Sequence, residues 1–227
     1  MLKKLSHPSL FFLITVLIIC SCTISRSSWR SGNLTYHKRT HFTKVWTSVL
    51  NEQKDAIFHS WCDWIEESPD WYTTYENEFS PDDIPSLQMI PILVYSIDFA
   101  SLSTFNYNAK LDRLLQLDTS RCRYFIKNNN EFISIVECRY GINNGLEIRR
   151  MSGFPKGGEQ IARDYMTDGK DVFFLNVYLA ENGKNKKELL VCKDGDDFKT
   201  IGQSNKVKLL KDVLEMFRNS LGKNVIL

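Results

Sequence analysis

Two apolar segments separated by a short polar stretch constrain the fold of this 227-residue chain more than any other feature. Residues 122–127 (CRYFIK) and 132–138 (FISIVEC) are rich in aromatic and β-branched side chains, which favour strands. Residues 128–131 (NNNE) between them have the composition of a tight turn. The sequence therefore predicts an antiparallel hairpin in the middle of the chain.

The side chains of this hairpin also indicate its register. If Asn128 faces Phe132, an opposite-charge pair and an apolar pair lie across from each other, and both kinds of pair favour that register. Opposed Cα atoms about 4.5–5.5 Å apart can be bridged by a disulfide, whereas a shift of one residue would separate the cysteines. We therefore predict a disulfide between Cys122 and Cys138, with two buried free thiols as the alternative. The facing pairs are Cys122 with Cys138, Arg123 with Glu137, and Phe125 with Ile135.

Other segments extend the hairpin into an α+β fold. Asn144-Gly145 is a strong two-residue hairpin signal that leads into a third strand. Helical spacing of apolar residues predicts an amphipathic helix at each end of the mature chain. Pro69 ends the first of these helices. We predict an antiparallel meander packed with these two helices, in a single domain over residues 42–227. The expected strands are 90–99, 122–127, 132–138, 146–151, 172–180 and 188–193, and the expected helices are 42–67, 108–117, 159–167 and 205–221.

An apolar run near the N-terminus predicts export. Residues 10–20 (LFFLITVLIIC) follow Lys3 and Lys4 directly. A run of this length is shorter than the roughly 20 residues that span a bilayer, and its basic start is typical of a signal peptide.

The end of this run resembles a bacterial lipoprotein signal, with an aliphatic residue (Ile19), a small residue (Ser21) and then a cysteine (Cys22). The resemblance implies that residues 1–21 are removed and that Cys22 carries acyl chains such as palmitate, which anchor the protein to a membrane of the bacterial cell envelope. Thr23 in place of Asp favours the outer membrane, with the domain in the periplasm or at the cell surface. The alternative to a lipoprotein signal is an ordinary secretory signal or an uncleaved anchor. We expect residues 22–41 to form a polar tether between the anchor and the domain.

Charge is unevenly distributed along the chain. Residues 23–54 contain six basic side chains and one acidic, residues 55–109 contain ten acidic and none basic, and residues 110–227 contain 21 basic and 16 acidic. The near-neutral total gives no reason to expect a nucleic-acid partner. The acidic stretch is either a surface for a basic partner or a segment that packs against the basic parts of the same chain.

Aromatic side chains are concentrated in the same acidic stretch. Trp61 and Trp64 are expected in the core, because they belong to the predicted first helix. A loop between prolines contains further aromatic and acidic residues, which are typical anchors of protein interfaces and also stack on sugars. These form the candidate binding patch: Trp71, Tyr72, Tyr75 and Glu76.

The sequence contains no recognisable catalytic motif. Histidine is scarce, and His37, His41 and His59 do not have convincing metal-ligand spacing, so we expect neither a metal nor a cofactor. The favoured function is a membrane-anchored envelope lipoprotein that binds a protein or a glycan through the acidic aromatic surface. The alternatives are an envelope hydrolase with a carboxylate pair and a structural subunit of an envelope complex.

Overall fold

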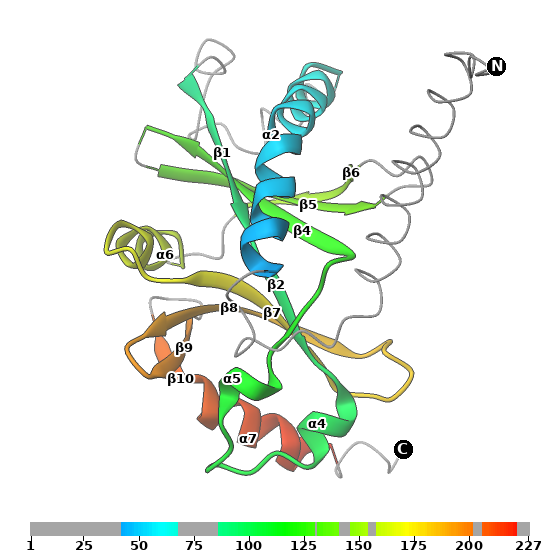
Figure 1. The fold of residues 1–227 in the computed structure, drawn as a ribbon, viewed down its shortest axis with the longest axis vertical. Coiled ribbons are helices and arrows are strands. Elements are labelled where there is room, and N and C mark those ends of the chain that lie inside the picture. The colour runs from blue at the N-terminus through cyan, green and yellow to red at the C-terminus, as the bar shows by residue number, and fades with distance from the viewer. Residues whose placement is uncertain are drawn as a thin grey trace, which may run out of the picture. The chain divides into compact units, whose positions relative to one another are not determined.

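A computed structural model describes the chain in six stretches, all within one compact unit, Leu34–Leu227. Helices combine with mainly antiparallel sheets, so the predicted α+β class is confirmed (Figure 1). None of the described helices has the length and apolar character needed to cross a membrane. The described residues are 42–67, 86–129, 131–140, 146–153, 158–201 and 206–221.

The predicted hairpin lies at the centre of a four-stranded antiparallel sheet. Its strands follow the order β1-β4-β5-β6, and β4 and β5 form the hairpin itself. Residues on both faces of these two strands are buried, so apolar residues such as Tyr124, Phe125 and Ile126 follow one another directly. The strands are β1 (Gln88–Ile92), β4 (Arg121–Asn128), β5 (Glu131–Tyr140) and β6 (Leu146–Ser152).

The remaining strands form a second sheet of six strands in the order β10-β9-β8-β7-β2-β3. Neighbouring strands are antiparallel except β2 and β7, which run parallel and pair Ser96 with Asn176. The predicted strands 172–180 and 188–193 correspond to β7 and β8. The strands of this sheet are β2 (Val94–Ile97), β3 (Gln116–Leu117), β7 (Val172–Tyr178), β8 (Lys186–Asp194), β9 (Asp197–Ile201) and β10 (Val207–Leu209).

The segment predicted as one strand over 90–99 connects the two sheets. It divides at Leu93 into β1 of the four-stranded sheet and β2 of the six-stranded sheet. The Leu93 carbonyl accepts a hydrogen bond from the Phe174 N–H at 3.0 Å, so pairing changes from one sheet to the other at this residue. One continuous apolar segment thus belongs to both sheets.

The predicted register is confirmed in the body of the hairpin and wrong at its tip. Cys122 faces Cys138, and the other two predicted pairs also form. Asn128, however, faces Glu131 rather than Phe132, and a bulge near Ile126 and Lys127 restores the predicted alignment. Asn129 has φ 51, a left-handed conformation that tight hairpin turns require.

Five helices accompany the sheets in the part of the chain that the structure describes. Helix α2 packs on β1 and β6, α6 contacts β5, β7 and β9, and α7 contacts α4, β9 and β10. The predicted helix 42–67 is confirmed, and so is 159–167 to within one residue. The predicted helix 108–117 is shorter and is followed directly by β3. The helices are α2 (Phe42–Glu67), α4 (Phe99–Ser103), α5 (Leu111–Leu114), α6 (Gly158–Thr167) and α7 (Leu210–Ser220).

Helix α2 covers one face of the four-stranded sheet. The Tyr124 hydroxyl on β4 donates a hydrogen bond to the Leu50 carbonyl at 3.0 Å, and the Trp46 ring lies 5.8 Å from the Tyr140 ring on β5. The buried face of the helix has the spacing that its sequence predicts. Its completely or almost completely buried side chains are Trp46, Leu50, Ile57, Trp61 and Ile65.

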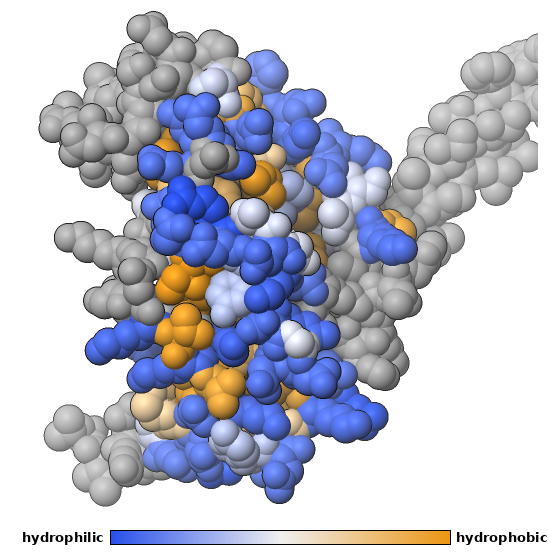
Figure 2. Space-filling view, turned by 90° about the vertical axis from the view of Figure 1, so that its left-hand side faces the viewer, coloured by the Kyte–Doolittle hydropathy of each residue, from blue (hydrophilic) through white to orange (hydrophobic). Residues whose placement is uncertain are grey.

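The opposite face of this sheet meets the six-stranded sheet and α6 in a second apolar core. Phe125 of β4 contacts Phe174 of β7 edge to face, with ring centroids 5.8 Å apart. Ala162 of α6 belongs to the same cluster. The surface on the α6 side is mainly hydrophilic, with a small group of apolar side chains near its middle (Figure 2).

The C-terminal part differs from the prediction in two respects. The turn at Asp194–Asp197, with Gly195 at φ 62, joins β8 to an unpredicted strand, β9. The final helix begins at Leu210 rather than 205, and Val207 belongs to β10, where it is 41% exposed instead of lying on the buried stripe of the helix. A short strand before a helix is hard to predict, because its few apolar residues also fit the helical spacing.

Candidate functional site

Two of the predicted sites lie outside the described residues. The candidate patch of Trp71, Tyr72, Tyr75 and Glu76 falls within 68–85, and the lipid-attachment residue Cys22 falls within 1–41. Both stay predictions. The described residues do include the helix that leads directly into the patch, and the outer surface of that helix is informative.

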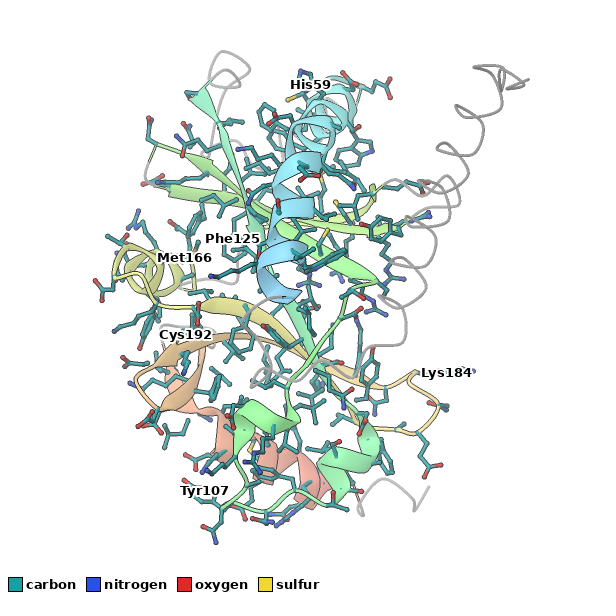
Figure 3. All side chains as sticks on the ribbon, viewed as in Figure 1. His59, Tyr107, Phe125, Met166, Lys184 and Cys192 are labelled. Atoms are coloured by element: carbon teal, nitrogen blue, oxygen red, sulfur yellow. The ribbon has the colours of Figure 1, made fainter. Side chains whose placement is uncertain are left out.

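The second half of α2 presents three acidic side chains and one histidine to solvent. Asp55, His59, Asp63 and Glu67 follow each other at intervals of four residues and are all exposed. Intervals of four place them on one face of the helix. Nδ1 of His59, which Figure 3 labels, lies 2.7 Å from the Asp55 carbonyl oxygen. We call these four residues together with Trp64 the α2 outer face.

Trp64 corrects an expectation from the sequence. Trp61 is completely buried as predicted, but the expected core position of Trp64 is wrong, since this side chain is 41% exposed. The helical repeat explains the difference, because Trp61 and Ile65 are separated by one turn and occupy the centre of the buried face. Trp64 lies at its rim, where a large apolar side chain is accessible beside Asp63 and Glu67.

The acidic side chains of this face are not neutralised by the rest of the described chain. Asp55, Asp63 and Glu67 form no ion pair with any other residue that the structure describes. Three arginines of β4, β5 and β6 instead pair with glutamates of the sheets: Arg123 with Glu137 and Glu188, Arg139 with Glu137, and Arg149 with Glu147. For these three acids, packing against described basic residues is therefore not the explanation of the charge segregation.

The predicted disulfide partners face each other in the core beneath α2. Cys122 and Cys138 are paired in the register, both are fully buried, and both are free thiols in the structure. The hydrogen bond with Cys138 and burial raise the pKa of Cys122 well above its ordinary value. The pair therefore has the predicted arrangement, while the bond itself stays a prediction.

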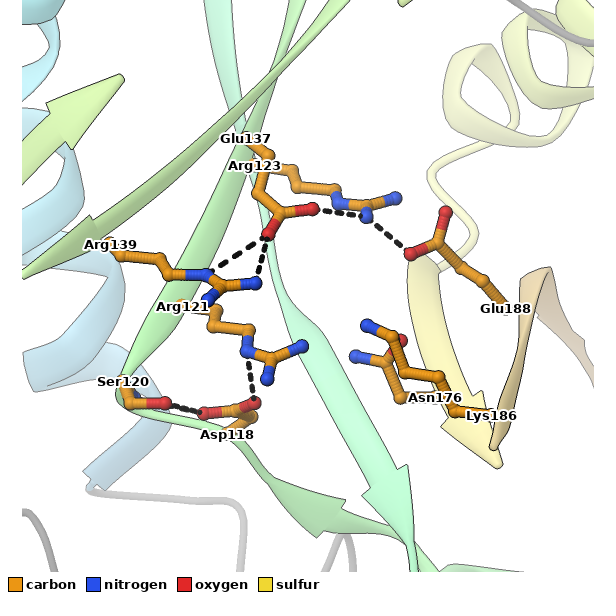
Figure 4. A network of polar contacts seen from close by, with 9 residues as sticks. All are labelled: Asp118, Ser120, Arg121, Arg123, Glu137, Arg139, Asn176, Lys186 and Glu188. Carbon is orange, nitrogen blue, oxygen red and sulfur yellow. Dashed lines mark hydrogen bonds and ion pairs between the residues drawn. The ribbon is translucent and has the colours of Figure 1, made fainter. Parts of the chain in front are cut away.

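The predicted Arg123–Glu137 pair belongs to a larger ion network that joins the two sheets (Figure 4). Nη2 of Arg123 donates to Glu137 Oε2 at 2.8 Å and also to Glu188 of β8. Arg139 donates to Glu137 Oε1 through Nε at 3.2 Å and Nη2 at 3.1 Å. The Arg123 guanidinium also lies 4.1 Å from the centre of the Phe174 ring.

This network keeps its central carboxylate ionised. Burial alone would raise the pKa of Glu137, but the charges and hydrogen bonds of Arg123 and Arg139 outweigh burial and lower it. A general acid needs a raised pKa so that it carries a proton near neutral pH. Glu137 therefore acts as a fixed negative charge that binds Arg123 of β4, and Arg123 in turn binds Glu188 of β8.

Sequence reasoning identified the Arg123–Glu137 pair but not its burial or its third partner. Glu188 is distant in the sequence, and only the packing of the two sheets brings it to Arg123. One available signal was Asn176, a polar residue in the middle of an otherwise apolar strand. Among the described residues, no group of three or more His, Cys, Asp or Glu side chains is placed to hold a metal ion.

Comparisons with known proteins identify no relative. No protein-family model, no curated protein and no solved structure matches the chain significantly.

Proposed function

We propose that this chain is a lipid-anchored protein of the bacterial cell envelope that binds a partner protein through an acidic aromatic surface. The anchor is Cys22, supported by the lipoprotein-like signal in the sequence. The surface consists of the α2 outer face and the candidate patch that follows it, Trp71, Tyr72, Tyr75 and Glu76. The observation that carries the proposal is the exposure of Trp64 among acids that no described residue neutralises.

Charge complementarity indicates the chemistry of the partner. Unneutralised carboxylates attract a surface rich in Lys and Arg and accelerate its approach. A half-exposed tryptophan supplies the large apolar contact that commonly dominates the binding energy of an interface. We therefore expect a basic segment of an envelope protein to lie along the α2 outer face, with an apolar side chain against Trp64.

Two carboxylates that form ion pairs in the described part of the chain are poorly suited to hydrolysis. The pKa of Asp194 is lowered by hydrogen bonds from Lys199 and Lys170, and the pKa of Glu137 is lowered by its arginines. A glycosidase-type mechanism needs one carboxyl group that remains protonated. Both of these carboxylates are committed to ion pairs instead.

Capture experiments with matched variants test the proposal. The tagged full chain is used to capture envelope proteins from detergent extract, beside two variants, Trp64→Ala and the triple change Asp55→Asn/Asp63→Asn/Glu67→Gln. We expect a partner protein that wild type captures and both variants lose, and that added salt releases from wild type. Cross-linking of the partner to the captured chain should identify a basic contact segment. The further variant Trp71→Ala/Tyr75→Ala tests the predicted patch in the same way.

The control removes the same charge from elsewhere. Glu131, Glu181 and Asp196 are exposed, and none of them belongs to α2. The triple change Glu131→Gln/Glu181→Gln/Asp196→Asn should retain the partner. Equal recovery by the α2 triple variant and by wild type would refute the proposed surface, and so would equal loss in the control.

A further inference from the structure

Beside the ion network, three side chains from separate strands place hydrogen-bond donors around one position. Arg121 begins β4, Asn176 lies within β7 and Lys186 begins β8. Figure 4 shows the Arg121 guanidinium directed toward Asn176 and Lys186 across the junction of the two sheets. This position is distinct from the α2 outer face.

Arg121 has few acceptors for its five N–H groups. Its one ion pair with a described residue joins Nε to Asp118 Oδ2 at 3.6 Å, which is long for a charged hydrogen bond. Nη1 is buried and has no acceptor in the described part of the chain. A buried donor without an acceptor is costly, so such a group normally has a partner.

Lys186 and Asn176 add further donors. Nζ of Lys186 donates to Asn176 Oδ1 at 3.2 Å, which directs the amide nitrogen of Asn176 away from the lysine. Asn176 is only 1% exposed, so its side chain is held in place by the surrounding strands. Burial lowers the pKa of Lys186, and the nearby positive charge of Arg121 lowers it further.

The charged groups around this position are not all paired. Arg123 is bound by Glu137 and Glu188, and Arg139 is bound by Glu137. Lys186 forms no ion pair with a described residue, and Arg121 forms only the long one with Asp118. A negatively charged group between Arg121 and Lys186 would supply the missing partner.

We propose that Arg121, Asn176 and Lys186 form a binding site for a single carboxylate group of a ligand. The planar guanidinium fork of Arg121 matches the two oxygens of a carboxylate, and Lys186 and the Asn176 amide donate from the other side. The site takes a free organic acid or the carboxylate of a peptide, both of which present the same group.

Acetate is the simplest probe. The melting temperature of the full chain in detergent is measured against acetate concentration, with chloride replacing acetate to hold ionic strength constant. A ligand that binds the folded state raises the melting temperature, and the half-saturating concentration reports its affinity. We expect saturable stabilisation in wild type and a half-saturating concentration about tenfold higher or more in Arg121→Gln and Lys186→Gln, since each loses charged hydrogen bonds.

The control is Lys184→Gln, which removes the same charge from the exposed loop between β7 and β8 (Figure 3). It should give the wild-type curve. Lys186 is only partly buried, so Lys186→Gln remains an adequate test if Arg121→Gln fails to fold. Identical curves in acetate and chloride, an unchanged response in Lys186→Gln, or saturable binding of phosphate but not of acetate would overturn the assignment.

Discussion

Cys122 of β4 stands directly opposite Cys138 of β5, and neither side chain is accessible to solvent. Both lie on the face of the hairpin that also carries Tyr124, because alternate residues of a strand share a face. The pair is therefore sealed beneath α2, to which Tyr124 is hydrogen-bonded. Any oxidation of the two thiols is controlled by the folding of this hairpin.

The first prediction concerns the oxidation state of the protein in its envelope location. We expect Cys122 and Cys138 to be joined by a disulfide there, each thiol losing one proton and one electron to a thiol oxidant such as a protein disulfide. The measurement is alkylation of free thiols without reductant, followed by mass spectrometry of the peptides, in which Cys122 and Cys138 should remain unalkylated. Alkylation of all four of Cys62, Cys122, Cys138 and Cys192 would contradict this prediction.

The timing of this oxidation is a related prediction. Because the pKa of Cys122 is raised well above 9.0 in the folded chain, little thiolate is present to attack an oxidant. We expect the reduced, folded protein to oxidise many times more slowly at pH 8 than the chain unfolded in denaturant. The measurement is the loss of free thiols with time, and similar rates in the two states would show that the thiols are not protected.

The second prediction concerns Glu137 and acid stability. Its folded-state pKa lies below the ordinary value of 4.5, so its contribution is fully present above about pH 4.5 and is lost as the pH falls through the folded-state pKa. Glu137→Gln should destabilise the protein by about 3 kcal/mol near neutral pH, because Arg123 loses a buried partner. The same change should also remove part of the pH dependence of the free energy of unfolding. This free energy is measured by urea unfolding between pH 3 and pH 7, in steps of about one pH unit.

The control for this prediction is Glu147→Gln on β6. Glu147 pairs with Arg149 at 2.8 Å, but their side chains are 43% and 52% exposed. Such a surface pair contributes roughly 0–1 kcal/mol. If Glu147→Gln and Glu137→Gln lowered the free energy of unfolding equally, the ion network would not have the central role described above.

The third prediction concerns the attachment of α2 to the sheet. Tyr124→Phe removes the buried hydrogen bond to the Leu50 carbonyl with little change in volume, and should cost about 1 kcal/mol. Tyr107 also has a hydroxyl hydrogen bond, to Asp212 at 2.9 Å, but its side chain is exposed. Tyr107→Phe should therefore leave the stability of the protein almost unchanged. The comparison is made by denaturant unfolding, and equal effects would contradict the buried contact.

Local sequence patterns predicted the hairpin, its register and the buried face of α2 because each depends on residues close together in the chain. Cross-strand pairs such as Arg123 and Glu137 can be aligned by counting from a short turn. The tip was wrong because a bulge changes the count by one residue, and apolar composition does not reveal a bulge.

The division into two sheets could not be predicted from the same patterns. Ile90–Phe99 contains one apolar segment, and nothing in it marks Leu93 as the point where pairing changes. The ion network has the same origin, because Glu188 and Lys186 reach β4 only after the sheets pack together. Trp64 was misplaced because a residue at the rim of a helical stripe satisfies the same spacing as one at its centre.

Site-specific photo-cross-linking can show whether a basic partner lies along the α2 outer face. A photoreactive residue replaces Ser60, which is exposed one turn before Trp64, or Glu181 on the β7–β8 loop as the control. We expect a discrete adduct from position 60 in intact cells and none from position 181. The adduct should be lost when Asp63→Asn/Glu67→Gln is added. No adduct at position 60, or the same adducts at both positions, would contradict this expectation.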